Sequence, residues 1–244
     1  MSMDLTPRQN QLLKAIIDEY ITSAEPVASE QVDKKYNLGV SPATIRNEMG
    51  ELTQMGFLRQ PHTSAGRIPT PQALRFYVDH LMQEKQLSLA EEVATKEQVW
   101  DVRLDYDRLL RHTSAALADR TKALSLITTD QGDVYYSGVA NILDMPEFFD
   151  IDVARTVLSM LDQQQRLRQL FFGRTYGPEP VHIVFGAELG WPYFEPVGMA
   201  FTYYDSGSRR GSLAVVGPCR LNFPHVIPCL RYFSGLMTEL ASSW

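Results

Sequence analysis

The sequence of 244 residues predicts an α+β protein in two parts: an N-terminal domain of helices that ends in a β-hairpin, and a C-terminal domain of helices with a mainly antiparallel sheet. Two observations predict this class. Before residue 80, three hydroxyl–proline pairs mark helix starts, and apolar residues recur at helical spacing. After residue 121, short runs of β-branched and aromatic residues alternate with helical stretches.

The composition is that of an ordinary globular protein, with 44% hydrophobic and 21% charged residues. The start of the chain lacks a signal-peptide core, and no apolar run reaches the ~18 residues of a membrane helix, so we expect a cytoplasmic protein. Two cysteines, Cys219 and Cys229, exclude a disulfide scaffold. The net charge of −6 argues against indiscriminate nucleic-acid binding but permits a local basic surface.

The first two helices are predicted from capping chemistry and periodicity. TPRQ at residues 6–9 forms a capping box with proline at the first helical position. An apolar stripe over residues 12–21 follows, and Pro26 ends the helix. A short second helix is predicted over residues 29–36.

A third helix is predicted from Pro42, behind the cap Ser41, to a stop at Gly56. Its buried face is formed by the apolar residues Ile45, Met49, Leu52 and Met55. Small residues and two long polar side chains fall opposite, namely Ala43, Thr44, Arg46, Asn47 and Gly50. Small residues permit close approach to a groove wall, while Arg and Asn can pair with guanine and adenine edges. A solvated helix face is the alternative.

The segment after this helix favours the first interpretation. Two extended runs flank a Ser/Gly turn at residues 63–66, which predicts a β-hairpin. From Phe57 to Arg75 there are three arginines and one histidine but no acid, a composition that suits contact with phosphates. Three helices followed by a hairpin is the order of a winged helix-turn-helix, whose last helix enters the major groove of DNA.

We therefore predict a winged-helix DNA-binding domain over residues 1–80. The residues predicted to contact double-stranded DNA are Ser41, Pro42, Ala43, Thr44, Arg46 and Asn47 on the third helix, and Arg59, His62, Thr63, Ser64, Gly66 and Arg67 on the hairpin.

The motifs of this region resemble a known family. LTPRQNQLLKAIIDEYI, SPATIRNEMGELTQMGFL, QPHTSAGRIPT and RFYVD are similar to the HrcA family of heat-shock transcription repressors. The resemblance implies a repressor that binds, as a homodimer, an inverted-repeat operator called CIRCE ahead of chaperone genes. It also implies that the chaperonin supports repression. Unfolded protein that occupies the chaperonin would then relieve repression.

A helical connector is predicted over residues 81–120, because residues 83–120 are rich in Glu, Gln, Lys, Arg, Leu and Ala and contain neither Pro nor Gly. Beyond it, the patterns predict strands over 123–128 and 134–139, a helical stretch over 146–173, a buried strand over 181–185, a hairpin of 198–204 and 212–216 around a turn at 205–211, and a helix over 223–240.

The C-terminal domain, residues 121–244, shares the resemblance. GVANILDMPEFFD and LAVVGPCRLNFPHVIPCL are similar to the GAF-like domain of HrcA. The resemblance also implies an inserted dimerising subdomain of roughly a hundred residues, whereas here only residues 130–133 join the corresponding segments. The connector and an aromatic-rich surface over 191–204 are then the candidate dimer contacts.

Two other functions compete with DNA binding. An enzyme is disfavoured because the five histidines are scattered and no HExxH, CxxC, phosphate loop or GxSxG motif is present, so we expect no catalytic residue, metal or cofactor. A small-molecule-sensing regulator is the alternative function, since GAF-like domains can bind ligands and the stretch 191–204 is aromatic. Packing in a core or interface is the favoured role of that stretch.

Overall fold

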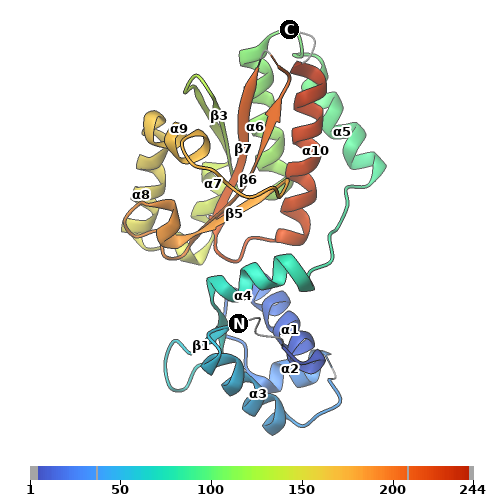
Figure 1. Cartoon of the computed structure of the whole chain (residues 1–244), viewed down its shortest axis with the longest axis vertical. Helices are drawn as coiled ribbons and strands as arrows, with labels where there is room; N and C mark the ends of the chain where they lie inside the picture. Colours follow the sequence, from blue (N-terminus) through green and yellow to red (C-terminus); the bar gives the residue numbers. More distant parts are fainter. Residues whose placement is uncertain (1–4, 37, 208, 242–244) are drawn as a thin grey trace. The chain divides into compact units, whose positions relative to one another are not determined.

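A computed structural model describes residues 5–36, 38–207 and 209–241 of the chain. The chain divides into two compact units, Met1–Gln83 and Glu84–Trp244 (Figure 1). The division lies just beyond the predicted end of the first domain at residue 80. It places most of the predicted connector inside the second unit, so that segment is not a separate link.

The first unit begins with three helices, α1 (Pro7–Ser23), α2 (Ser29–Tyr36) and α3 (Pro42–Gln54). The predicted capping box is present, with the Gln9 backbone N–H donating to Thr6 Oγ1 at 3.2 Å and the Thr6 N–H donating to Gln9 Oε1 at 3.0 Å. The end of α1 was predicted at Pro26, but the helix stops earlier because Ala24 adopts a left-handed conformation with φ 61°.

A small hairpin follows α3, with β1 (Leu58–Arg59) antiparallel to β2 (Ile68–Pro69). Helix α4 (Pro71–Phe76) then continues as the π-helical turn η1 (Tyr77–Leu81). The helices enclose a core of fully buried side chains, among them Leu12, Leu13, Ile16, Ile17, Val32, Ile45 and Leu52. The unit therefore has the predicted winged-helix order.

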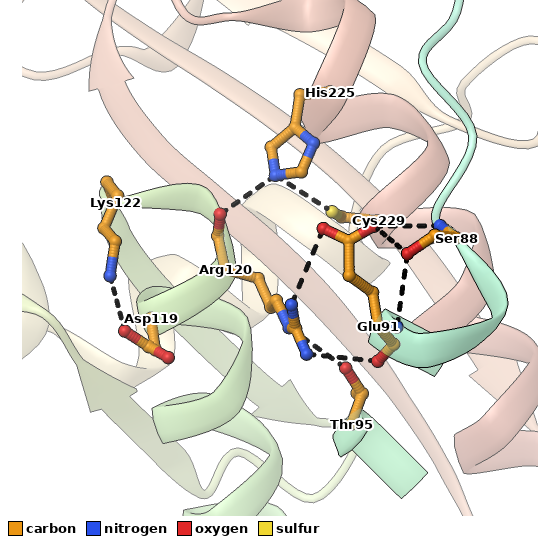
Figure 2. Close-up of polar contacts among 8 residues, drawn as sticks. All are labelled: Ser88, Glu91, Thr95, Asp119, Arg120, Lys122, His225 and Cys229. Carbon is orange, nitrogen blue, oxygen red and sulfur yellow. Dashed lines mark hydrogen bonds and ion pairs between the residues drawn. The ribbon is translucent and has the colours of Figure 1, made fainter. Parts of the chain in front are cut away.

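The second unit opens with α5 (Leu89–Trp100) and α6 (Tyr106–Thr121). Figure 2 shows how the Arg120 side chain joins them: its Nε donates to Thr95 Oγ1 at 3.2 Å, and its Nη2 donates to the Glu91 carbonyl at 3.1 Å. The Arg120 carbonyl accepts a hydrogen bond of 2.9 Å from His225 Nε2, which ties α6 to the last helix. These polar contacts fix the predicted connector to the rest of its unit.

Within the described residues, the second unit holds a five-stranded antiparallel sheet in the order β4-β3-β7-β6-β5. The strands are β3 (Leu124–Thr129), β4 (Val134–Ser137), β5 (His182–Phe185), β6 (Val197–Asp205) and β7 (Arg210–Pro218). The predicted hairpin is the long β6–β7 pair; Ser208 in its turn lies outside the described residues. The strand predicted over 134–139 ends earlier, and β5 lies at the sheet edge instead of being fully buried.

Helices cover both faces of this sheet (Figure 1). The remaining elements are α7 (Val139–Leu143), the 3-10 turn η2 (Pro146–Phe148), α8 (Ile151–Leu161), α9 (Gln164–Phe172), the 3-10 turn η3 (Gly186–Leu189) and α10 (Phe223–Ala241). The helical stretch predicted over 146–173 is thus broken into three pieces. Its predicted apolar side is partly wrong, because Ile151 and Leu158 are exposed.

The main core of the second unit lies between the sheet and helices α7 to α9. It contains alternate residues of the strands, which point to one face because side chains alternate along a strand. The opposite face packs against α6 and α10, where the Tyr106 and Tyr204 hydroxyls are hydrogen-bonded at 2.8 Å. The unit is therefore an α+β layer structure with a sheet buried on both sides.

Candidate nucleic-acid interface

The outer face of α3 carries the side chains that the sequence predicts to read bases. Ser41 caps the helix by accepting a hydrogen bond of 3.2 Å from the Thr44 N–H. Ala43, Arg46 and Asn47 are exposed, whereas Ile45, Met49 and Leu52 are buried on the inner face. The predicted division of the helix into two faces is therefore present, with Thr44 half-buried at its edge and Met55 only partly buried.

Arg46 is held by a carboxylate from the neighbouring helix. Its Nη2 lies 2.6 Å from Glu30 Oε1, near the start of α2. The pKa of Glu30 is lowered, first by a hydrogen bond from its own backbone N–H and then by the charge of Arg46. Glu30 was not among the predicted site residues, because a pairing between two helices leaves no signal in the spacing of a single sequence.

The wing is an ordered loop. Gln60 Nε2 donates hydrogen bonds of 2.9 Å to the carbonyls of Thr63 and Ala65, which cross-links the two sides of the turn. His62 Nδ1 lies 3.2 Å from Ser64 Oγ. The predicted contact residues Arg59, His62, Thr63 and Ser64 are all exposed, so they are accessible to a ligand of the size of DNA.

The base of the wing is anchored to the segment between α1 and α2. Arg67 and Val27 exchange two backbone hydrogen bonds of 2.9 Å. A Cβ atom added at Gly66 would lie 2.3 Å from the Val27 carbonyl oxygen, so only glycine permits this close approach. The half-buried side chain of Arg67 places its Nε 3.2 Å from Thr53 Oγ1 on α3. Gly66 therefore has a packing role, and Arg67 links the wing to α3.

A cleft of about 330 Å³ lies between the start of α2, the outer side of α3 and the wing. Glu30, Arg46, Gln60 and residues 63–67 are among those that line it. The cleft therefore joins the exposed outer side of α3 to the wing, the two elements that contact DNA in winged helices.

The inner face of α3 carries a second pair that the sequence analysis missed. Glu48 is buried, and its Oε1 accepts a hydrogen bond of 2.6 Å from Arg8 Nε at the start of α1. This hydrogen bond raises the pKa of Arg8. The Gln9 amide also donates to Glu51 Oε2 at 3.0 Å. These contacts set the position of α3 relative to α1.

A cysteine–histidine pair in the second unit is not a nucleophilic site. Cys229 Sγ lies 3.6 Å from His225 Nε2 (Figure 2). Because a carbonyl can only accept, the bond from this nitrogen to the Arg120 carbonyl requires Nε2 to carry a proton, and it is then no base for the thiol. Burial raises the pKa of Cys229 to about 11, which keeps the thiol neutral.

The aromatic-rich stretch 191–204 was predicted as a possible dimer surface, and the structure corrects this. Trp191, Phe194, Phe201 and Tyr204 are buried, and Tyr193 is exposed. Phe201 lies inside an aromatic cluster with Phe171 and Tyr176, at ring-centroid distances of 5.2 and 4.8 Å. Most of the stretch forms the core instead, because residues 197–204 belong to strand β6, which helices cover on both faces.

Among the described residues, no group of three or more His, Cys, Asp or Glu side chains is arranged to hold a metal ion. In the same part of the chain, no helix combines the length and apolar character that crossing a membrane requires.

Comparisons with known proteins cover nearly the whole chain. Residues 4–82 match the family model described as "Winged helix-turn-helix transcription repressor, HrcA DNA-binding", and residues 70–227 match "HrcA protein C terminal domain". The heat-inducible transcription repressor HrcA of Carboxydothermus hydrogenoformans is 27% identical, over 96% of this chain and 97% of the relative. That of Symbiobacterium thermophilum is 28% identical, over 96% and 98%.

Each of these alignments runs over 334 positions, although this chain has 244 residues, so much of each relative falls opposite gaps. The crystal structure of a hypothetical protein superposes with a TM-score of 0.76 at 20% identity, covering 98% of this chain and 99% of that chain. This likeness concerns the fold of the chain.

Proposed function

Because this chain belongs to the HrcA family of heat-inducible transcription repressors, we propose that it represses chaperone genes by binding an inverted-repeat operator of the CIRCE type as a homodimer. The observation that carries the proposal is the outer face of α3, where Arg46 and Asn47 are exposed while the apolar residues Ile45, Met49 and Leu52 are buried on the inner face. A repressor acts on the chromosome, so its proposed location is the cytoplasm.

Within this proposal, α3 reads bases and the wing binds the backbone. Asn47 suits bidentate pairing with adenine and Arg46 with guanine in the major groove. Arg59, His62, Thr63, Ser64 and Arg67 surround the cleft or the wing tip, where contacts to phosphate position the protein without reading sequence. Ser41, Pro42, Ala43 and Thr44 bring the start of α3 close to the groove wall.

The proposed dimer follows from the symmetry of an inverted repeat, because two winged helices must be held at a fixed half-site spacing. The structure supports α5 as the contact. Leu89 and Val93, one helical turn apart on this helix, are 75% and 49% exposed, so α5 presents apolar side chains to solvent. This replaces the aromatic stretch 191–204, which is buried. Modulation by the chaperonin rests on the family resemblance.

The base-reading assignment is tested by comparing an operator duplex with a scrambled duplex of equal composition at stated salt. Asn47→Ala should weaken operator binding by ~1–3 kcal/mol and relax specificity at particular positions. Arg67→Ala should weaken binding to both duplexes alike and reduce the salt slope by about one. Altered base preference in Arg67→Ala, with no change in Asn47→Ala, would reverse the assignment.

The dimer is tested by light scattering of the free protein at micromolar concentration. Val93→Glu should produce a monomer with weaker operator binding, because it places a charge in the proposed contact. Ile151→Glu is the matched control, since Ile151 is also an exposed apolar residue of a helix in the same unit. A wild-type monomer, or a Val93→Glu variant that stays dimeric, would contradict the α5 contact.

A further inference from the structure

The ion pair between Arg46 and Glu30 lies on the surface proposed to contact DNA. The two side chains are 68% and 53% exposed, and Nη2 is 2.6 Å from Oε1. Exposed ion pairs contribute little to the stability of a fold because solvent screens them and both side chains lose freedom. We therefore expect the pair to affect the conformation of the Arg46 side chain more than the stability of the unit.

The Glu30 carboxylate is itself held in place by its surroundings. Ser29 is buried, and its hydroxyl donates to Glu30 Oε2 at 3.3 Å. One oxygen thus faces α2 while the other faces Arg46, and the start of α2 determines where the guanidinium lies.

We propose that Glu30 is a positioning residue for base reading, which holds the Arg46 guanidinium in orientation on the outer face of α3. The inference rests on the proposed function of that face. A guanidinium has five N–H donors, and Glu30 accepts from Nη2 alone, so enough donors remain for a bidentate contact with a guanine edge. An Arg held in this way loses less conformational freedom when it binds.

The same carboxylate also opposes binding without base contact. In a non-specific complex the affinity comes from phosphates, and an acid lining the cleft beside α3 is repelled by them. In the specific complex, Arg46 lies between Glu30 and a base and offsets this repulsion. Glu30 therefore raises the ratio of operator affinity to scrambled-DNA affinity in two ways.

Three variants test the proposal with the full chain and the two duplexes described above. Glu30→Asp keeps the charge but shortens the side chain, so the ratio should fall roughly three- to tenfold with scrambled-DNA binding unchanged. Glu30→Gln should lower the ratio similarly and tighten binding to scrambled DNA. Glu25→Gln is the control, because Glu25 is an exposed acid in the segment before α2 and, among the described residues, makes no hydrogen bond or ion pair with Arg46.

A double variant shows whether the effect passes through Arg46. In an Arg46→Ala background, Glu30→Asp should leave the ratio unchanged, since there is no guanidinium to position. An unchanged or higher ratio in Glu30→Asp would overturn the inference. A higher ratio would indicate that the ion pair opens when DNA binds. A wild-type chain that does not prefer the operator would instead overturn the proposed function. Circular dichroism confirms that each variant is folded.

Discussion

The outer face of α3 and the aromatic stretch 191–204 were both predicted from the sequence to be surfaces that bind a partner, but only the first is exposed in the structure. Arg46 and Asn47 of α3 are exposed, whereas Trp191, Phe194 and Phe201 are buried. Helix α3 packs along one stripe only, so its opposite face remains outside. Strand β6, which holds Phe201, lies inside a sheet covered on both faces, so consecutive residues from Val197 to Thr202 are buried on either side. The amino-acid composition of a segment therefore does not show whether its side chains are exposed or buried.

The largest expected difference between the two regions is in stability. Phe201→Ala should lower the free energy of unfolding of the second unit by ~3–5 kcal/mol, because it removes a fully buried ring. All three tryptophans of the sequence come after residue 84, and Trp100 and Trp191 lie in that unit, so tryptophan fluorescence during urea unfolding reports on it. Asn47→Ala is the control and should change the free energy by less than ~0.5 kcal/mol. Similar changes in the free energy of unfolding for the two variants would contradict the difference in burial between the two regions.

A smaller effect is expected at the base of the wing. Gly66→Ala should destabilise the first unit by ~1–3 kcal/mol, because the new Cβ would clash with the Val27 carbonyl. Gly50→Ala on α3 is the matched control: its added Cβ meets nothing within 4 Å, and it should stabilise the helix slightly. Urea unfolding followed by circular dichroism measures both. Equal behaviour of the two variants would mean that the wing is not packed on the α1–α2 segment.

Removing one hydroxyl should have a still smaller effect in the second unit. Tyr106→Phe should lower the free energy of unfolding by ~0.5–1.5 kcal/mol, because it removes the 2.8 Å bond to the buried Tyr204 hydroxyl and keeps the ring. Tyr193→Phe is the control at an exposed position and should be neutral. Tryptophan fluorescence measures both. A neutral Tyr106→Phe would show that this hydroxyl pair does not hold α6 to the sheet.

The smallest expected effect depends on pH. Hydrogen bonds from Arg231 lower the pKa of Glu84 below its ordinary value of 4.5. A lowered pKa in the folded state contributes stability above pH 4.5 that is lost as the pH falls through the lower value. The urea midpoints of the wild type and Glu84→Gln should therefore differ at pH 7 and converge in acid. A difference that grows as the pH falls would contradict this sign.

Much of the first unit could be predicted because its signals are local. Thr6, Ser41 and Thr70 cap helices within their own first turns, and apolar residues repeat with the helical period. The break between α8 and α9 and the exposure of Ile151 could not be predicted in this way. The apolar pattern continues through residues 146–173, and only packing against the sheet decides which side of each piece is covered.

The sequence by itself determined the order of the elements, the two faces of α3 and the acid-free wing, because capping, periodicity and charge act over a few neighbouring residues. Only the tertiary structure decided that Glu30 meets Arg46, that Glu48 meets Arg8 and that β6 is buried on both sides. These contacts join residues from different helices or depend on the layers around a strand. Their positions are set by how the elements pack, which the spacing of residues along one chain does not specify.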